Sequence, residues 1–546
     1  MRIGHIFILI VALFAAAVRA APARVAGDCL DSRLFSNTSL YLYTSPSNPK
    51  YISSSNILSY QDHTVVEVAT NFMVTYYSTY KVVKNFYGSN NTYVLYQCGS
   101  PMPNVTTLGL ANNTKVFQIP LRGISASDTT LNGFLNLLGV QDRVYYASPY
   151  SVAACFDLLA TGSCSRSSNS VNSSNIDAKF SFSETASDST SIAFTATTDP
   201  GALNRAEYIK YLSVFFNLET TANSVFSTIR DTFNNISANV ATTLNNTNAT
   251  KPTMAWIYYQ PGGSYGSYSW AEEVELYFTQ YRMDYVSAAG GNFLNVTNVL
   301  AALPNRSDIT YTSGKLGVIV FTNLSYTYPY LVQALSSVDI LIDESVYPGV
   351  SGTNVTTGLI VSTMHLYNST SSTPNTIANL KFLNASNPSI LRLDGRVNPS
   401  GSLDTYETAI ARPDLVLADF VRAIYPSFAV SIVGAASSSG SFVRSLDSNS
   451  VTLITASTCS PGVNSQCIIA AANATIAAIC PPVYINCNEE VVYATTSSPC
   501  APTTCSSNSS SLTPSANDAA AVKPASAILS LAASFFASLL FFRFFL

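Results

Sequence analysis

The sequence predicts an α/β fold with two Rossmann-like lobes, joined by a long backbone helix and followed by a cysteine-rich extension. On both sides of the chain's centre, short apolar runs typical of strands alternate with helical patterns, and this alternation is typical of parallel βαβ units. Between the two regions lies a long helical periodicity, from Leu203 to Leu244. Behind the second region most of the cysteines crowd into residues 459–505.

The N-terminal lobe is assigned to residues 21–200. Its strand candidates are rich in Val, Ile, Tyr and Phe, and its helix candidate ends at a glycine, the usual residue after a helix. The expected strands are Thr92–Gln97, Lys115–Pro120 and Arg143–Tyr146, and the expected helix is Thr129–Leu138, closed by Gly139.

The connecting backbone helix is assigned to residues 201–250. From Leu203 onward apolar residues recur at gaps of three and four, which marks one face of an α-helix. Asp199 is the expected N-cap, with Pro200 at the first helical position. The pattern fits one long helix or two shorter ones.

The C-terminal lobe is assigned to residues 251–447. It repeats the alternation of the first lobe, again with glycines after a helical pattern. The expected strands are Thr253–Tyr259, Leu316–Phe321 and Val338–Ile342, and the expected helices are Trp270–Ala288 and Tyr328–Leu335.

Both ends of the chain carry patterns typical of targeting segments. Residues 1–20 have a basic start, an apolar run and small residues before the cut, as in a signal peptide; the alternative, a membrane anchor, needs a longer run. Residues 518–546 have the form of a GPI-attachment propeptide, with Asn517 the expected attachment residue and Ser515 or Ala516 its rivals. A retained transmembrane helix is the alternative there. Residues 506–517 are the expected Ser/Thr stalk. We therefore expect a protein of the secretory pathway, held on the outer leaflet of the plasma membrane.

Charge is scarce in this chain. Only 11% of its 546 residues are charged, against about 25% in ordinary soluble domains, and the mean hydropathy is +0.22. The formal net charge of −4 gives no electrostatic footprint for nucleic acid. Removing both targeting segments leaves the charged fraction near 11%, so they do not explain it.

N-linked glycans are the expected substitute for charge as the solubilising group. The sequon N-x-[ST] begins at Asn37, Asn90, Asn104, Asn112, Asn172, Asn235, Asn245, Asn248, Asn295, Asn305, Asn323, Asn354, Asn368, Asn384, Asn473 and Asn508.

The ten cysteines predict disulfides, because an even count in a secreted chain favours pairing. The cysteine-rich segment is assigned to residues 448–505, and its pairing stays open. No C-x-x-C pair is present, and the mature chain has only His63 and His365, so we expect no metal site and no structural zinc.

Several stretches of the chain together carry a family resemblance. They are YKVVKN at 80–85, residues 93–103 and 116–150, DPGALNRAEYIKYLSVFFNLE at 199–219, AAGGNFL at 288–294, and DTYETAIARPDLVLADFVRAIYPS at 404–427. These stretches are similar to the class III substrate-binding proteins of ABC transporters, the periplasmic receptors for iron–siderophore complexes and cobalamin. This resemblance implies two α/β lobes bridged by a rigid helix, with a ligand in the cleft. The family's acidic docking residues for a permease cannot be placed here, and the cysteine-rich extension is foreign to its pattern.

Ligands of such folds lie at the carboxyl ends of the strands, between the lobes. In the first lobe the loop of residues 122–129 follows a strand and opens a helix, so its hydroxyls and amides could meet an anionic ligand. Ordinary N-capping by Ser127 or Asp128 is the alternative. The ligand-binding candidates of this lobe are Arg122, Ser125, Ser127, Asp128, Tyr146 and Ser148, with Tyr145 beside them.

In the second lobe the candidates are aromatic or acidic, since flat rings with one polar end suit a macrocycle or an aromatic chelator. Scattered surface tyrosine is the alternative for any one of the chain's 32 tyrosines. The candidates are Tyr259, Tyr265, Trp270 and Glu344, with Tyr258, Gln260 and Asp343 beside them, while Trp256 is expected in the core.

One enzyme motif has to be weighed. Gly262 to Gly266 match G-x-S-x-G, the nucleophile elbow, with Ser264 as the serine and with Asp343 and His365 later in the order that hydrolases use. The elbow needs a helix directly after the serine, and here the helical pattern begins only near Trp270. We therefore expect no enzyme.

The function expected from the sequence is capture of a small ligand by a cell-surface solute-binding protein. By resemblance the ligand is a ferric siderophore, another metal chelate or a cobalamin, with no resident cofactor. Hand-off to a reductase or transporter is the expected next step. The alternatives are a GPI-anchored surface or wall glycoprotein that kept the fold without the ligand and, less favoured, a hydrolase using Ser264.

Overall fold

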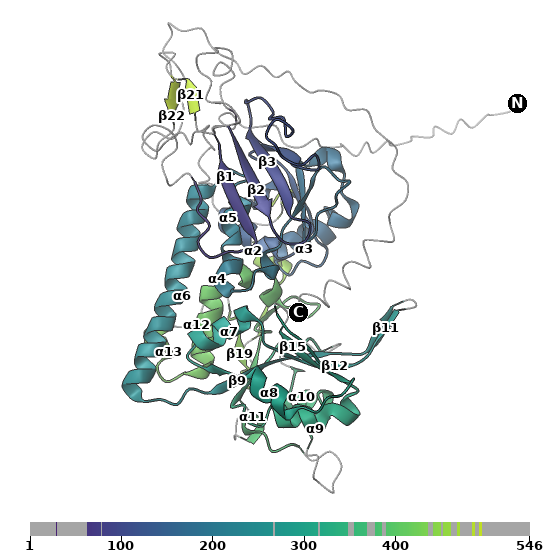
Figure 1. Ribbon diagram of the computed structural model, residues 1–546, viewed down its shortest axis with the longest axis vertical. Coiled ribbons are helices and arrows are strands. Elements are labelled where there is room, and N and C mark those ends of the chain that lie inside the picture. The colour runs from purple at the N-terminus through teal and green to yellow at the C-terminus, as the bar shows by residue number, and fades with distance from the viewer. Residues whose placement is uncertain are drawn as a thin grey trace, which may run out of the picture.

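The computed structural model has two lobes, with the long helix α6 running along one side of both (Figure 1). The signal peptide, stalk and GPI predictions fall outside the residues that the structure describes. Those residues are 29, 63–77, 79–265, 268–314, 317–347, 354–367, 377–384, 389–434, 440–448, 451–459, 463, 467–469, 483–485 and 491–493.

The N-terminal lobe contains two four-stranded sheets. In the first, antiparallel pairs join β1 to β2 and β2 to β3, and a parallel pair joins β3 to β4: β1 (Phe72–Tyr76), β2 (Tyr80–Asn85), β3 (Asn91–Gln97) and β4 (Lys115–Ile119). The second is wholly parallel, in the order β6-β5-β7-β8: β5 (Ile124–Ala126), β6 (Val144–Ala147), β7 (Ala178–Ser181) and β8 (Ser191–Ala193).

The helices of this lobe follow strands, as the βα alternation predicts. Gly139 closes α2 in the left-handed region, with φ 72°, as expected for the residue after a helix. The helices are α2 (Leu131–Leu138), α3 (Ala154–Thr161), α4 (Ala202–Ala206) and α5 (Tyr208–Ser213).

The connecting region of residues 201–250 contains three helices, namely α4, α5 and then α6 (Glu219–Thr247). The N-cap expectation at Asp199 is wrong, because Gly201 caps α4. Asp199 instead is buried and accepts hydrogen bonds from the amides of Thr70 and Asn71.

Helix α6 packs into a hydrophobic core of each lobe, which explains its length. Its first half buries Ala222, Phe226 and Ile229 in the core of the N-terminal lobe. Its second half buries Phe233 and Val240, among others, in a core of the C-terminal lobe that it shares with α12 (Pro413–Ile424). The apolar face of this one helix therefore packs against both lobes and holds them together.

The C-terminal lobe is built on an eight-stranded mixed sheet. Its main path runs β14-β15-β12-β9-β16-β17-β19, and β13 pairs with β9. The strands β9, β16 and β17 are parallel neighbours. The strands are β9 (Thr253–Gln260), β12 (Glu273–Tyr277), β13 (Asn292–Phe293), β14 (Ile309–Thr312), β15 (Val318–Thr322), β16 (Ile340–Asp343), β17 (Ile390–Arg392) and β19 (Arg444–Ser445).

The predicted helix Trp270–Ala288 is wrong over its first half. Strand β9 continues beyond the sheet as a long hairpin through β10 (Gly263–Tyr265) and β11 (Tyr268–Trp270), which returns as β12 and projects from the lobe in Figure 1. Helix α7 begins only at Gln280. The remaining helices and short strands are α7 (Gln280–Ala288), α8 (Val296–Ala302), α9 (Leu324–Ala334), α10 (Thr357–Thr363), α11 (Lys381–Asn384), α13 (Ala429–Val433), β18 (Arg396–Val397), β20 (Thr452–Leu453), β21 (Val483–Ile485) and β22 (Val491–Tyr493).

The cysteine-rich extension is joined covalently to the N-terminal lobe. Cys155 at the start of α3 is bonded to Cys459, and Cys164 just beyond its end is bonded to Cys467. These bridges span 304 and 303 residues of sequence. A third bridge joins Cys29 to Cys98, after β3. The chain therefore leaves the C-terminal lobe and returns to the lobe where it began.

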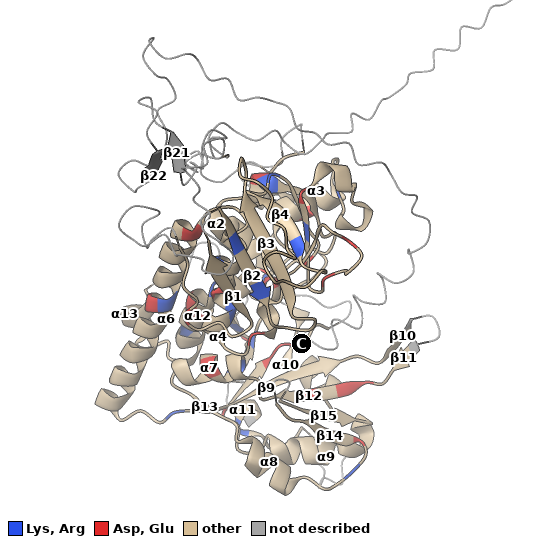
Figure 2. Ribbon diagram, turned by 45° about the horizontal axis from the view of Figure 1, so that its top comes forward, with Lys and Arg blue, Asp and Glu red and all other residues tan. Residues whose placement is uncertain are grey.

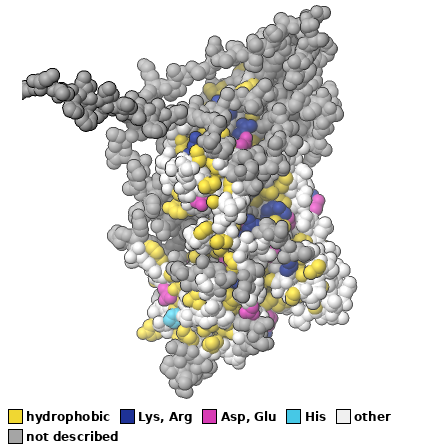
Figure 3. Space-filling model, turned by 180° about the vertical axis from the view of Figure 1, so that it is seen from behind, with side chains coloured by type: hydrophobic (Ala, Val, Ile, Leu, Met, Phe, Trp, Pro, Cys, Tyr) yellow, Lys and Arg dark blue, Asp and Glu magenta, His cyan; other side chains and the backbone are white. Residues whose placement is uncertain are grey.

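Charged residues are sparse along the described part of the chain (Figure 2), and few charged side chains are seen on the face drawn in Figure 3. In the described part of the chain every lysine and arginine forms an ion pair except Lys84, Arg166, Lys179, Arg205 and Lys251. Several of the pairs, such as Arg392 with Asp394, are buried. Most of the described cations are thus matched to anions within the fold, some in the interior and others at the surface.

The sequon asparagines lie on the surface. Every one whose side chain is described is exposed: Asn90, Asn104, Asn112, Asn172, Asn235, Asn245, Asn248, Asn295, Asn305, Asn323 and Asn354. Asparagines outside sequons are not uniformly so, since Asn71, Asn85 and Asn132 are buried. The glycosylation predictions at Asn37, Asn368, Asn473 and Asn508, and the side chain of Asn384, lie outside the described residues.

Candidate functional site

A short segment lies between the carboxyl ends of the parallel strands of the two lobes. We call residues 404–411 the crossing segment; it comprises η8 (Asp404–Tyr406), Glu407, Thr408 and η9 (Ala409–Ala411). On the C-terminal lobe, the Thr405 hydroxyl donates to the carbonyl of Leu393 at 2.7 Å, directly after β17, and the Tyr406 hydroxyl donates to the carbonyl of Glu344 at 3.3 Å, directly after β16.

The other side of the crossing segment meets the N-terminal lobe. The Glu407 carboxylate accepts hydrogen bonds from the amides of Val152 and Ala153, which follow β6, at 2.6 and 2.9 Å. It also accepts one from the Asn132 side chain in α2, which follows β5. The carboxyl edges of both sheets therefore face the same interlobe region, which is where α/β folds bind ligands.

Close packing holds the crossing segment on α2. A Cβ at Gly133 would lie 3.0 Å from the Cα of Thr408 and 3.2 Å from the Cβ of Ala411. Only a residue without a side chain allows the two backbones to approach this closely. The interlobe region next to α2 is therefore filled by the chain itself.

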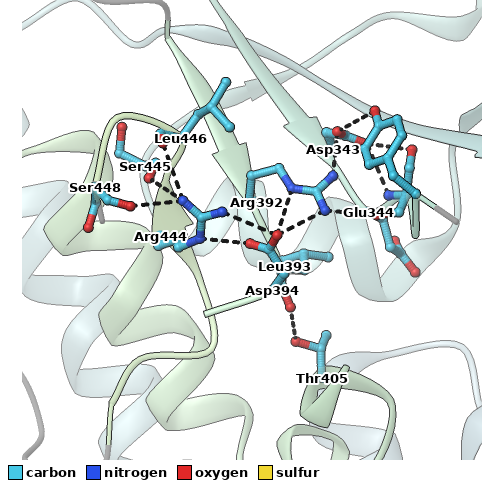
Figure 4. Close-up of polar contacts among 12 residues, drawn as sticks. Asp343, Glu344, Arg392, Leu393, Asp394, Thr405, Arg444, Ser445, Leu446 and Ser448 are labelled. Atoms are coloured by element: carbon cyan, nitrogen blue, oxygen red, sulfur yellow. Dashed lines mark hydrogen bonds and ion pairs between the residues drawn. The ribbon is translucent and has the colours of Figure 1, made fainter. Parts of the chain in front are cut away.

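A buried ion network lies at the carboxyl edge of the C-terminal sheet (Figure 4). Arg392 bridges Asp343 at 2.5 Å and Asp394 at 3.0 Å, and Arg444 binds the other side of Asp394 at 2.8 Å. All four side chains are buried. Because each charge has a partner, this network stabilises the sheet edge and leaves none of these groups for a ligand.

Glu344 belongs to a second buried pair. Arg282 of α7 donates to both of its carboxylate oxygens, at 2.8 and 2.9 Å, and the indole of Trp256 donates to the same group. The guanidinium also lies over the rings of Tyr277 and Tyr281, with 3.9 and 4.5 Å to the ring centroids. The predicted ligand residue Glu344 is thus a structural anion, while Trp256 is in the core as expected.

Beside this pair, tyrosines and glutamates gather on one face of β9 and β12. We call Tyr258, Glu273, Glu275 and Tyr277 the tyrosine–glutamate cluster. Glu275 stands directly opposite Tyr258 in the antiparallel register. Burial, followed by repulsion from Glu273, raises the pKa of Glu275 to about 7, although a hydrogen bond from the Tyr277 hydroxyl opposes the rise. Of this cluster, Tyr258 lies close enough to Tyr406 of the crossing segment to affect its pKa.

The N-terminal candidates are largely occupied by local bonds. Arg122 forms an ion pair with Asp177 at 2.5 Å, and the Tyr146 hydroxyl accepts from Asn175. Asp128 accepts from the amide and hydroxyl of Thr130, but the alternative of capping by Ser127 or Asp128 is wrong, because the N-cap of α2 is Thr130.

The predicted serines lie where the sequence puts them, at the strand ends. Ser125 is fully buried, with its hydroxyl 3.4 Å from that of Ser127. Ser148 is also buried and accepts from the amide of Tyr150. Tyr145 is buried as well, under the guanidinium of Arg166.

The C-terminal candidates separate onto different faces. Tyr259 points to the opposite face of the sheet from Tyr258, and its hydroxyl donates to Glu272 at 2.8 Å. Trp270 lies in the hairpin, where its indole donates to the carbonyl of Pro261 at 2.9 Å. The side chain of Tyr265 lies outside the described residues. The structure therefore does not gather the predicted set into one site.

The hydrolase alternative fails on backbone geometry. Ser264 lies in β10 and pairs with Ser269 of β11. A nucleophile elbow requires a sharp turn from a strand directly into a helix. A serine within an antiparallel hairpin does not have that geometry, so the motif match at 262–266 is incidental.

Other site types were sought across the described residues. A hollow of about 140 Å³ lies on the outer face of the first sheet, away from every predicted ligand residue; it is lined by Met73, Thr75, Tyr77, Tyr80, Val82, Lys84, Leu108 and Leu110. No group of three or more His, Cys, Asp and Glu side chains in the described ranges is arranged to hold a metal ion. None of the helices described combines the length and apolar character of a membrane span.

No family model matches this chain. No curated protein matches it either. Solved structures to which it is similar include a periplasmic heme-binding protein from Pseudomonas aeruginosa, at 11% identity and TM-score 0.34, covering 56% of this chain and 94% of that one. The periplasmic heme-binding protein RhuT from Roseiflexus sp. has 11% identity and TM-score 0.31, with 56% and 98% covered. The siderophore-binding protein BauB, bound to acinetobactin and ferric iron, has 11% identity and TM-score 0.33, with 56% and 93% covered.

Three residues of the interlobe region were missed by the sequence analysis: Glu275, Tyr406 and Glu407. Glu275 was hidden by the helix expected from Trp270, although the alternation of Glu273, Val274, Glu275, Leu276 and Tyr277 is a strand pattern. Tyr406 and Glu407 lie in a stretch quoted only for its family resemblance. No local signal marks them, because their role depends on contacts more than 60 residues away.

Proposed function

We propose that this chain is a cell-surface solute-binding protein that captures a small ligand between its two lobes. The observation that carries the proposal is the crossing segment, which brings the carboxyl edges of both parallel sheets to one place. The similarity to periplasmic binding proteins agrees with the proposal but does not carry it. Ligand capture requires no chemical step, and we assign none.

The ligand class is a ferric siderophore, another metal chelate or a cobalamin. Flat tyrosine rings with polar ends suit such ligands, and Tyr258, Tyr277 and Tyr281 lie on the C-terminal side of the interlobe region. The molecule would be held by a GPI anchor at Asn517, and would pass its ligand to a reductase or transporter.

A second candidate is a surface glycoprotein that kept the fold without a ligand. Two observations favour it: most predicted ligand residues are bonded within the protein, and the sequon asparagines that can be placed are all exposed. The two candidates differ in whether the interlobe region admits a solute.

Thermal denaturation of the secreted ectodomain distinguishes them. The panel contains ferric hydroxamates, ferric catecholates and cobalamins. A ligand at 100 times its Kd stabilises the folded state by about 2.7 kcal/mol, so we expect a rise in Tm of several degrees with one class. No shift with any member of the panel would favour the second candidate. Release of the full chain from cells by a phosphatidylinositol-specific phospholipase tests the anchor separately.

A further inference from the structure

The face of β9 that carries Tyr258 has a regular arrangement. Tyr277 stands opposite Trp256, Glu275 opposite Tyr258, and Glu273 opposite Gln260. Opposed residues of an antiparallel pair lie on the same face of the sheet, within side-chain contact. Glu272 lies on the other face, bonded to Tyr259. Two carboxylates and two phenols therefore lie on the same face of the sheet, and one of them, Tyr258, lies close enough to Tyr406 of the crossing segment to affect its pKa.

The Tyr258 hydroxyl is available to a group from outside the chain. Tyr258 is only 7% exposed and its hydroxyl makes no hydrogen bond to any described residue, yet this oxygen is not among the fully buried polar atoms, so it reaches solvent. Burial raises its pKa, and the nearby carboxylates of Glu275 and Glu344 raise it further. A hydroxyl that lies beside carboxylates and still reaches solvent can bind a polar group of a ligand.

Some carboxylates near Tyr258 have an ion-pair partner and Glu275 does not. Arg282 neutralises Glu344, and Arg392 neutralises Asp343. Glu275 forms no ion pair with any described residue, and its hydrogen-bond donor, the Tyr277 hydroxyl, is neutral. Burial is the main cause of its raised pKa of about 7, and Arg282, which is paired with Glu344, opposes that rise only in part. The face is therefore short of one positive charge.

We propose that the ligand carries a positively charged ammonium group, which binds between Glu275 and Tyr258. An ammonium has three donors and no acceptor, so it suits a carboxylate and a phenol oxygen that face each other. This inference rests on the proposed function and narrows its ligand class to cationic chelates; the anionic ligand first expected at Arg122 is not part of it.

A matched pair of ferric trihydroxamates tests the inference. Ferrioxamine B carries a free ammonium, and its N-acetyl derivative has the same iron centre without the charge. We expect the wild-type ectodomain to bind the ammonium form at least about tenfold more tightly by fluorescence quenching, since charge-assisted hydrogen bonds contribute about 1.5–3 kcal/mol. The preference should grow between pH 6 and pH 8, as Glu275 loses its proton in the presence of Glu273, Glu344, Arg282, Tyr258 and Tyr277.

Three variants locate the effect. Glu275→Gln should remove the preference while retaining affinity for the acetylated complex, and the isosteric Tyr258→Phe should reduce it severalfold. Glu272→Gln, on the opposite face of the same strand, is the matched control and should leave the preference intact. Equal binding of the two complexes by the wild type would overturn the inference and leave the proposed function standing. Binding of neither would overturn the proposed function for this ligand class, and the inference with it.

Discussion

The Glu407 carboxylate accepts a hydrogen bond of 2.6 Å from the side-chain amide of Asn132, although 275 residues separate the two in sequence. Asn132 lies in the first turn of α2, and Glu407 lies in the segment that has just left the C-terminal sheet. Both side chains are buried. The contact joins the two lobes in addition to α6, which packs against both.

Shortening Glu407 should destabilise the protein strongly. Glu407→Ala leaves the amides of Val152 and Ala153 and the amide of Asn132 without their acceptor. Each buried unsatisfied group costs about 1–3 kcal/mol, so we expect a loss of about 3 kcal/mol or more in the free energy of unfolding. Urea denaturation of the ectodomain measures it. Glu407→Gln keeps one acceptor oxygen and should lose less; an equal loss in both variants would contradict this explanation.

The same residue should give stability a pH dependence. Burial raises the pKa of Glu407 from its ordinary value of 4.5 to about 8. Between these values the unfolded chain has lost the proton and the folded protein keeps it. Stability should therefore be greatest below pH 4.5, fall by up to about 1.4 kcal/mol per pH unit toward pH 8, and then level off.

The measurement is the difference between wild type and Glu407→Gln across that range, because other groups titrate equally in both. A flat difference would show that Glu407 stays ionised in the fold. The Asn132 side-chain oxygen, buried and without a hydrogen-bond partner, would accept the proton of a neutral Glu407 if its amide turned through 180°.

The disulfides from α3 to the extension should appear in peptide mapping of the unreduced ectodomain. We expect Cys155 linked to Cys459 and Cys164 linked to Cys467, and pairing of Cys459 or Cys467 within the cysteine-rich segment would contradict the arrangement. The double variant Cys155→Ser with Cys459→Ser should lower stability by about 2–5 kcal/mol, because the bridge closes a very long loop. The control is Cys29→Ser with Cys98→Ser, which should leave the attachment of the extension unchanged.

The exposed sequons should carry glycans when the chain is secreted from eukaryotic cells. Enzymatic deglycosylation in heavy-oxygen water marks each occupied asparagine by a mass change, and we expect the mark at Asn235 and Asn245 on the outer face of α6. Asn239 on the same helix is exposed but outside a sequon, and should stay unmarked. A bare α6 would contradict the explanation offered for the low charge.

The fold class could be predicted from the sequence because its signals are local. The strands at β3, β4, β9 and β15 each have the apolar composition of a buried strand, and α6 has a stripe that is easily read. The hairpin at β10 and β11 was missed because Gly, Ser and Tyr alternate there without an apolar face. Its pairing comes from strand β9 continuing past the sheet.

The site was harder to predict because the sequence does not say which polar groups already have partners. Arg122, Tyr259 and Glu344 lie at or near the predicted strand ends, yet each is bonded within the protein, to Asp177, Glu272 and Arg282 respectively. Partners from distant parts of the chain decide whether a strand-end residue is free to bind. Tyr258, set beside the main candidates, makes no hydroxyl hydrogen bond to a described residue, and its oxygen is not among the fully buried ones.

The pairing of charges within the fold affects how copies of the molecule interact at high local concentration. Because most of its cations are matched to anions within the fold, little electrostatic repulsion keeps copies apart. Sugars on exposed asparagines would keep them apart sterically, which neither salt nor pH abolishes. Such a surface suits a protein that must stay dispersed at high density on a membrane while its medium changes in acidity or ionic strength.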